Sequence, residues 1–316
     1  MVKHLITLKD LKPEEIEHII NKAIEIKKNP EKYSDILKNK TLIMLFQKTS
    51  TRTRLSFEDG MNFLGGQAIF VDWSTTQFNI ADIRDETRAM ERYADIIVAR
   101  LLKHETLMNM VKAARTPIIN GLDEKYHPCQ GLGDSLTMVE KSGGTLEDFK
   151  GKKVVYLGIG NNVSNSLVMA TTKLGAKITL CIAEKDKAAY DEELEAQAKA
   201  TGLYEETTDL NCLKDADFVY TDTWINMEFF DKDGNIVPEF KEEFERRKKK
   251  FLPFQLSKAL LDKYSCKGKI MHNMACHPPY EITRDAIEHP NSIIFDQAEN
   301  RLHVQKAIIL YLLGKI

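Results

Sequence analysis

The sequence predicts an α/β protein of two domains, each with a parallel sheet flanked by helices. Its 316 residues exceed one ordinary domain, which usually has about 100–200 residues. Short apolar runs alternate with longer helical patterns along the chain, and strands separated by helices favour parallel sheets covered on both faces. The segment 141–153 interrupts this alternation with glycines and charged residues. We therefore expect one domain over residues 1–145 and a second over residues 146–295.

The first domain is expected to begin with a helix and to continue with four strands. Apolar residues recur at helical spacing from Ile16 to Ile24, after Pro13, whose fixed backbone angle suits the first turn of a helix. Runs typical of strands occupy residues 41–46, 68–72, 96–100 and 117–121. Helical patterns separate these strands at residues 55–63, 85–93, 106–114 and 131–140.

The second domain repeats the same alternation. Strands are predicted at residues 153–157, 177–183, 218–221, 270–273 and 292–296. Helices are predicted at residues 164–174, 187–200 and 256–264. The charged run 241–250 contains residues of both signs, so it is more typical of an exposed helix than of a nucleic-acid-binding patch.

Charge and hydropathy exclude several classes of protein. The chain has 45 Lys and Arg against 47 Asp and Glu, a formal net charge of -2, so no general basic field can hold nucleic acid or an anionic membrane. Mean hydropathy is -0.34, and the longest apolar stretches, such as 307–313, are far shorter than the roughly 20 residues of a membrane span. The N-terminus lacks the apolar core of a signal peptide. We expect a cytoplasmic protein that binds neither nucleic acid nor membrane.

The cysteines favour reduced thiols. There are five of them, an odd number without a CxxC pair, which argues against a disulfide framework and against a structural zinc site. His272, Cys276 and His277 lie close together, but the two prolines that follow are typical of a loop, and no acidic partner is obvious. The sequence therefore predicts neither a metal nor a cofactor.

A run of basic and hydroxyl side chains, Lys48 to Arg54, follows the strand 41–46 and precedes a helical pattern. Hydroxyls, backbone N–H groups and guanidinium groups would meet there at a helix N-terminus, where a dianionic phosphate is well stabilised. An ordinary N-cap with solvated arginines is the alternative. Because two arginines in a first turn oppose the helix dipole, a bound anion explains them better.

His127 and Gln130 follow the strand 117–121, at the edge of the sheet where ligands of open parallel sheets bind. A neutral imidazole and a carboxamide at that edge can donate hydrogen bonds to a carbonyl oxygen and polarise its carbon for attack. Taken alone, His127 is more often a structural histidine. Arg100, at the end of the strand 96–100, is equally ambiguous alone and suggestive in this company.

Four segments, in this order, resemble the signature of the aspartate/ornithine carbamoyltransferases. They are Ser50–Arg54 (STRTR), Arg100, His127–Gln130 (HPCQ) and Glu299–Arg301 (ENR). The resemblance covers nearly the whole chain. It implies a cleft between the two domains, a C-terminal helix over residues 296–316 that returns to pack on the first domain, and active sites shared between subunits of a homotrimer or a multiple of trimers.

The resemblance also implies that the first domain binds carbamoyl phosphate. The phosphate is expected on Ser50, Thr51, Arg52 and Thr53, and the carbamoyl group on Arg100, His127 and Gln130. Arg301, just ahead of the last helix, would reach the same ligand, and Gln77 would do so from a neighbouring subunit. The expected catalytic residues are Arg52, Arg100, His127, Gln130 and Arg301.

Two further residues have expected roles near the donor. Arg54 either contacts the phosphate or braces its loop. Carbamoyl transfer needs no covalent nucleophile, because an uncharged amine can attack a polarised carbonyl carbon while phosphate leaves. Cys129 is therefore expected to be a small packing residue.

The second domain should bind the amine acceptor. The segment Gly158–Asn162 is a poor dinucleotide fingerprint, because Val163 replaces the third glycine, and it resembles the GNN segment of ornithine carbamoyltransferases. The stretch Asp222–Met227 likewise resembles their DxWxSM motif. The expected acceptor contacts are Asn162, Asp222, Asn226, Met227, His272, Asn273 and Met274.

Two departures from the family pattern concern the acceptor. Asn226 stands where the family has serine, and the HCLP motif is replaced by the sequence HNMA at His272–Ala275. Cys276 follows closely and could occupy the space of the missing cysteine. A third departure, Asp82–Asp85, lies in the loop that neighbouring subunits share.

L-Ornithine is the first choice of acceptor, giving L-citrulline and phosphate. The alternatives are an N-acylated ornithine, another diamino acid and putrescine, which the groups suited to an α-amino acid disfavour. A non-catalytic paralogue that binds carbamoyl phosphate or an amino acid is a competing class. A nucleotide-dependent dehydrogenase is weaker still, because its glycine fingerprint is broken.

Overall fold

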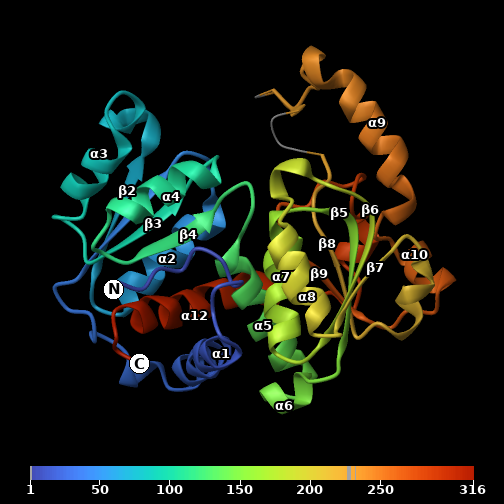
Figure 1. The fold of residues 1–316 in the computed structure, drawn as a ribbon. Coiled ribbons are helices and arrows are strands. Elements are labelled where there is room, and N and C mark those ends of the chain that lie inside the picture. Colours follow the sequence, from blue (N-terminus) through green and yellow to red (C-terminus); the bar gives the residue numbers. More distant parts are fainter. Residues whose placement is uncertain (1, 226–228, 232) are drawn as a thin grey trace.

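The computed structural model describes residues 2–225, 229–231 and 233–316. It contains two parallel sheets side by side, each covered by helices (Figure 1). This is the predicted fold class. Among the described residues, no helix is both long and apolar enough to cross a membrane.

The first sheet has the strand order β2-β1-β3-β4, and all its strands are parallel. Its strands are β1 (Thr41–Phe46), β2 (Gln67–Asp72), β3 (Ile96–Arg100) and β4 (Ile118–Leu122). The helices of this half are α1 (Pro13–Lys28), α2 (Thr51–Phe63), α3 (Ile83–Met90) and α4 (His104–Ala113). β1 and β3 are buried along almost their whole length, as expected for parallel strands covered on both faces.

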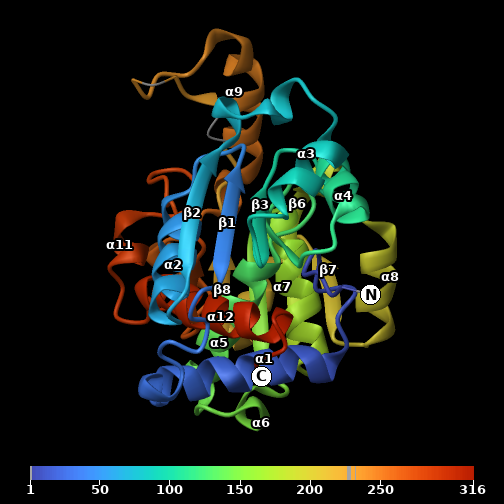
Figure 2. The same ribbon diagram turned by 90° about the vertical axis from the view of Figure 1, so that its left-hand side faces the viewer.

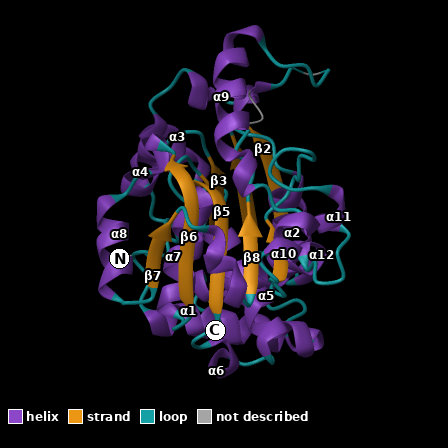
Figure 3. Cartoon of the chain, turned by 90° about the vertical axis from the view of Figure 1, so that its right-hand side faces the viewer, coloured by secondary structure: helices purple, strands orange, loops and turns teal. Residues whose placement is uncertain are grey.

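The second sheet has the order β7-β6-β5-β8-β9 and is also parallel (Figure 3). Its strands are β5 (Lys153–Gly160), β6 (Lys177–Lys185), β7 (Tyr204–Thr207), β8 (Phe218–Thr221) and β9 (Lys269–His272). Its helices are α6 (Leu146–Phe149), α7 (Asn162–Lys173), α8 (Glu192–Ala200), α9 (Lys241–Phe251), α10 (Lys258–Lys263) and α11 (Arg284–Ile287). The charged run 241–250 thus forms the exposed helix that was predicted.

Two helices join the halves. α5 (Pro128–Ser142) packs against α7 of the second half, and α12 (Ile294–Leu312) runs back from β9 to pack on α5, α1 and α2. Figure 2 shows α12 beside α1 at the foot of the first sheet. The predicted return of the C-terminal helix to the first domain is confirmed. Gly131 permits the close packing of α5 on α7, because a Cβ at this position would lie only 2.8 Å from the Ser166 carbonyl oxygen.

The secondary structure differs from the prediction at several places, and α6 and α11 form where no helix is predicted. The strand predicted at 292–296 is wrong: Ser292 makes a single bridge to Ile270, and α12 begins at Ile294, because buried residues continue at helical spacing beyond 296. The helix predicted at 187–200 begins only at Glu192, since Asp191 caps it by accepting from the Leu194 N–H at 3.1 Å. β7 was missed because the sequence of this edge strand is polar.

Candidate active site

The two predicted half-sites lie where each sheet reverses its winding direction. In the first sheet the chain moves outward from β1 to β2 and then returns to β3 on the other side of β1. In the second sheet it moves from β5 to β6 and β7 and then returns to β8. Loops at the carboxyl ends of such strands diverge and leave room for a ligand. The predicted donor residues follow β1 and β3, and predicted acceptor residues follow β5 and β8.

The N-terminus of α2 provides the first anion-binding element. Ser50 is the N-cap residue, and its Oγ accepts a hydrogen bond from the Thr53 N–H at 3.4 Å. The other N–H groups of a first turn have no partner within the helix, and this turn contains no acidic residue. Thr51 and Arg52 lie in the same turn. The local geometry therefore matches the predicted phosphate-binding turn.

Three arginines gather around His127 from separate elements: Arg52 from α2, Arg100 from the end of β3, and Arg301 from α12. Within the described part of the chain, no carboxylate forms an ion pair with any of them. Burial and the neighbouring Arg301 and Arg52 lower the pKa of Arg100 to about 9. An anion with two negative charges would supply the counter-charge that this cluster lacks in its own protein environment.

His127 is a buried, neutral group at the centre of the cluster. It precedes the first residue of α5, and its backbone N–H donates to Ser166 Oγ at 2.8 Å. Burial, together with Arg301, Arg100 and Arg52, holds the pKa of His127 well below its usual range. Its Nδ1 makes no hydrogen bond to any described residue. A neutral imidazole has one donor and one acceptor nitrogen, so His127 suits hydrogen bonding to a carbonyl group.

Gln130 and Arg301 are linked directly. The Arg301 guanidinium donates to Gln130 Oε1, and to Thr53 Oγ1 at 3.2 Å. Gly133 leaves space for this side chain, because a Cβ there would lie 2.9 Å from Arg301 Cδ. The expectation that Arg301 precedes the last helix is wrong, since α12 begins at Ile294 and Arg301 lies within it. The helical position holds the guanidinium against α5.

Asp222 is the main charged group of the acceptor side. It follows β8 and is 5% exposed. Its Oδ2 accepts from Asn161 Nδ2 at 2.7 Å, and its Oδ1 accepts from the Thr223 N–H at 2.8 Å. Burial nevertheless raises the pKa of Asp222. A cationic ligand group would favour the charged carboxylate.

Asn162 begins α7 and contacts the first half of the molecule. Its Nδ2 donates to the Asp123 carbonyl oxygen at 2.6 Å. Asn161, immediately before it, caps the helix by accepting from the Val163 and Ser164 N–H groups, each at 3.0 Å. The two asparagines therefore have different roles. Asn161 donates a hydrogen bond to Asp222 and caps α7, while Asn162 lies at the junction between the half-sites.

The segment after β9 carries the remaining acceptor candidates. The Met274 N–H donates to His272 Nδ1 at 2.8 Å, so Nδ1 has no proton, and Nε2 donates to Glu281 Oε1 at 3.1 Å. His272 is thereby an orienting group. Asn273 Oδ1 is buried without a hydrogen-bond partner among the described residues. Cys276 lies beside His272.

The donor and acceptor sides face each other. Arg52 lies close enough to Asp222 and Cys276 to interact with them electrostatically. The predicted residues Asn226 and Met227 lie outside the described residues. Gln77 lies in a short 3-10 turn over Gln77–Asn79, and no hydrogen bond of the described chain joins its side chain to the arginines. No group of three or more His, Cys, Asp or Glu residues that could hold a metal occurs in the described ranges.

A polar junction fixes the two halves next to the site. Asp191 Oδ2 accepts from Lys9 Nζ at 3.1 Å and from the Tyr126 hydroxyl. Asn165 Nδ2 donates to the Lys125 carbonyl oxygen at 3.0 Å. Because Tyr126 directly precedes His127, the position of this histidine depends on both halves of the molecule.

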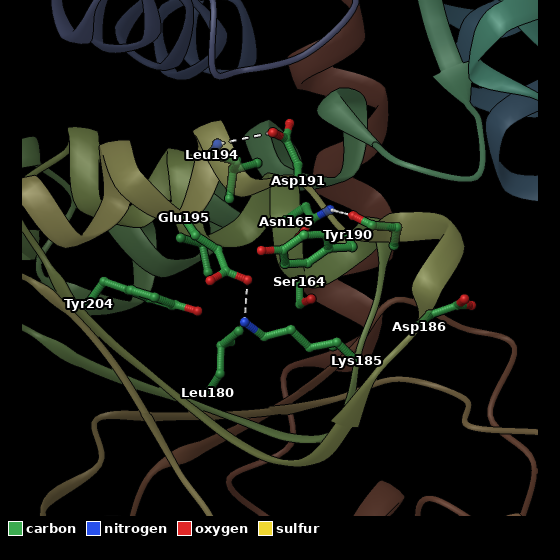
Figure 4. Close-up of a pocket in the computed structure, with 13 residues that line it drawn as sticks. Ser164, Asn165, Leu180, Lys185, Asp186, Tyr190, Asp191, Leu194, Glu195 and Tyr204 are labelled. Atoms are coloured by element: carbon green, nitrogen blue, oxygen red, sulfur yellow. Dashed lines mark hydrogen bonds and ion pairs between the residues drawn. The ribbon is translucent and has the colours of Figure 1, made fainter.

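A separate hollow lies between α7, α8 and β6 (Figure 4). Asp191 and Asn165 line it, and Lys185 forms ion pairs in it with Glu195 and, at 2.6 Å, with Glu206. None of the predicted substrate-binding residues lines this hollow. Lys185 is paired there with Glu195, and Asp191 is paired with Lys9, so this hollow differs from the arginine cluster.

Four residues that support the site have no role predicted from the sequence: Asn161, Ser166, Glu281 and Asp134. Asn161 could have been found, because an Asn before a helical pattern with Ser164 three residues later is a helix-capping signal. The other three act through partners far away in the sequence or on another element, and no local pattern marks them.

Known proteins resemble this chain over both halves. Residues 3–140 match the family model for the aspartate/ornithine carbamoyltransferase carbamoyl-P binding domain, and residues 150–312 match the model for the Asp/Orn binding domain. An ornithine carbamoyltransferase of Pyrococcus horikoshii is 40% identical, with 99% of this chain and 96% of the relative covered. One of Bacillus subtilis is 39% identical, with 99% and 94% covered.

A solved structure agrees with the sequence comparison. The ornithine carbamoyltransferase of Pyrococcus furiosus superposes with a TM-score of 0.88 at 39% identity, covering 99% of this chain and 98% of the other. The fold and the site thus define a two-domain α/β transferase. The chain belongs to the aspartate/ornithine carbamoyltransferase family and is a carbamoyltransferase.

Proposed function

We propose that the protein transfers the carbamoyl group of carbamoyl phosphate to the side-chain amine of L-ornithine, giving L-citrulline and phosphate, a reaction of arginine metabolism. The observation that carries this proposal is the convergence of Arg52, Arg100 and Arg301 on the neutral, buried His127, with Asp222 opposite Arg52. Such a site holds a dianion beside a polarised carbonyl and an amino acid beyond it.

The donor half of the site has three tasks. Ser50, Thr51, Arg52 and Thr53 bind the phosphate at the start of α2, where N–H groups and positive charge coincide. Arg100, His127 and Gln130 hydrogen-bond to the carbamoyl group, and Arg301 reaches the same ligand from α12. The hydrogen bonds to the carbonyl oxygen strengthen as negative charge develops on it, and the arginines stabilise the departing phosphate.

The acceptor half positions the attacking amine. Asp222 binds the α-ammonium group, and Asn162, Asn226, Met227, His272, Asn273 and Met274 surround the remainder of the amino acid. The uncharged side-chain amine adds to the carbonyl carbon, the bond from that carbon to the phosphate oxygen breaks, and the nitrogen loses one proton, which the departing phosphate accepts. Domain closure over the amino acid would exclude water, which would otherwise hydrolyse the donor.

The acceptor is tested by measuring ureido-product formation from carbamoyl phosphate with a panel of amines. The panel contains L-ornithine, N-acetylornithine, N-succinylornithine, putrescine, L-lysine, 2,3-diaminopropionate and L-aspartate. We expect L-ornithine to give a kcat/KM at least about 100-fold above the others, because only it combines an α-ammonium for Asp222 with a free side-chain amine of this length. A faster reaction with another amine would overturn the choice of ornithine. Binding of carbamoyl phosphate without any product would favour the non-catalytic paralogue.

We also propose a homotrimer or a multiple of trimers. Large apolar side chains are exposed on neighbouring elements of the first half: Leu55 on α2 (58%), Ile69 on β2 (42%) and, beyond β2, Ile80 (88%). Burial of these side chains between subunits would remove their apolar surface from water. Sedimentation equilibrium should give about three times the chain mass of 36.1 kDa, or a multiple of that; a monomer mass at micromolar concentration would contradict the proposal.

We also propose that the protein is located in the cytoplasm. The five cysteines are all free, and free thiols are typical of a reducing compartment.

A further inference from the structure

A buried hydrogen-bond chain runs from the donor site to the acceptor side. Arg301 donates to Gln130 Oε1, and Gln130 Nε2 donates to Asp134 Oδ1 at 2.8 Å. Asp134 lies one turn after Gln130 on α5 and is fully buried. The carboxylate therefore holds the amide of Gln130 in the orientation in which its oxygen meets Arg301.

The same carboxylate oxygen holds a second amide. Gln297 Nε2, on α12, donates to Asp134 Oδ1 at 2.6 Å, and Gln297 Oε1 accepts from the His272 backbone N–H at 2.9 Å. Gln297 is also fully buried. His272 is the last residue of β9 and begins the segment that carries Asn273, Met274 and Cys276. The chain thus ends on the backbone of the acceptor segment.

The orientation of each amide in this chain is fixed. An amide nitrogen only donates and its oxygen only accepts, so turning either glutamine over would break both of its hydrogen bonds. In a buried environment each lost bond leaves an unsatisfied polar group, which is unfavourable. Gln130 and Gln297 are therefore both held to the same oxygen of Asp134.

We propose that Asp134 and Gln297 are positioning residues that couple occupancy of the carbamoyl phosphate site to the conformation of the acceptor segment 272–276. This inference rests on the proposed function. A dianion that draws the Arg301 guanidinium toward itself shifts Gln130, and the two amides on Asp134 carry that shift to the backbone of His272. The donor then increases affinity for the amino acid, and by linkage the amino acid increases affinity for the donor by the same factor.

The test measures this factor directly. L-2-Aminopentanoate resembles ornithine but lacks the reacting amine, so its Kd can be measured by calorimetry with and without saturating carbamoyl phosphate. We expect the donor to tighten binding about tenfold in the unchanged protein, within the usual range of allosteric coupling. In Gln297→Met the ratio should fall to within about twofold of unity, while the Kd of carbamoyl phosphate alone changes less than about threefold, because Gln130 and Asp134 remain in place.

Gln305→Met is the matched control. Gln305 lies on α12 two turns beyond Gln297 and is equally buried, but its amide makes no hydrogen bond to the described residues. This variant should keep the tenfold ratio, so a loss confined to Gln297→Met cannot come from the substitution of a buried glutamine as such. A loss of the ratio in both variants would contradict the proposal.

If Gln297→Met does not fold, Asp134→Asn tests the coupling instead. Burial raises the pKa of Asp134 to about 7, so the measurement is made well above this pH, where the carboxylate is charged. The asparagine oxygen can still accept from both amides, but the bonds are no longer charge-assisted and weaken by about half, so the ratio should fall to about threefold. An unchanged ratio in the folded variants, or a ratio of one in the unchanged protein, overturns the coupling. If the unchanged protein forms citrulline and still shows no coupling, only this inference fails; if it neither forms a ureido product nor binds 2-aminopentanoate, the proposed function fails.

Discussion

Replacing Arg52 with alanine should lower kcat/KM for carbamoyl phosphate by about 10²–10³-fold, because it removes a guanidinium that both binds the phosphate and stabilises it as it leaves. The side chain is half-buried at the first turn of α2 and makes no ion pair with a carboxylate of the described chain. Folding should not depend on it. Steady-state kinetics with both substrates varied, together with thermal unfolding, measure the effect.

Arg54→Ala is the matched control on the same helix. Arg54 Nε donates to Glu58 at 3.1 Å, and its guanidinium lies 4.0 Å from the centroid of the Phe70 ring. These contacts indicate that Arg54 braces the turn, so its removal should change kcat/KM by less than about fivefold, in keeping with the small energies of exposed ion pairs. Near-normal activity of Arg52→Ala would contradict the phosphate assignment.

His127→Ala should lower kcat/KM by about 10²–10³-fold, the usual cost of one donor to a developing oxyanion. His127→Gln keeps a donor at this place and should recover part of the loss. His303→Ala is a suitable control, because His303 lies on α12 beside Glu299 at 3.3 Å and away from the arginine cluster. If both His127 variants kept the rate and the carbamoyl phosphate affinity of the unchanged protein, the polarising role would have to be abandoned.

The pH profile gives an independent check on His127. Because burial and the nearby arginines hold its pKa well below the usual range, the imidazole is already neutral at pH 6 and does not titrate between pH 6 and 9. The rate should rise with pH as the attacking amine loses its proton, while loss of charge on Arg100, whose pKa is about 9, opposes this rise at the upper end of the range. A limb near pH 6.5 that disappears in His127→Gln would show that the histidine titrates there.

The donor residues could be proposed from the sequence because they stand in short local motifs, and the structure brings Arg52, Arg100 and Arg301 together around His127. The STRTR and HPCQ segments each follow a strand, and parallel strands bring their carboxyl ends to one edge of the sheet. Arg301 was identified by its motif, but its place within α12 was not, since the apolar run at 292–296 is equally compatible with a short strand.

The supporting groups could not be predicted in the same way. Asp134 meets Gln297 across 163 positions of sequence, and only the return of α12 to α5 brings them together. Ser166 reaches the His127 backbone because α7 packs on α5. The predicted acceptor contacts Asn226 and Met227 lie outside the described residues, so they stay predictions.

The junction at Tyr126 and His127 limits how this protein can be divided and recombined. The histidine backbone is anchored to Ser166, and the preceding tyrosine to Asp191, and both anchors belong to the half that binds the acceptor. Grafting a foreign acceptor half onto this donor half would therefore alter the chemistry as well as the substrate range. A functional chimera has to keep α7 and the start of α8 from the parent that supplies His127, so the unit that can be exchanged is smaller than a domain.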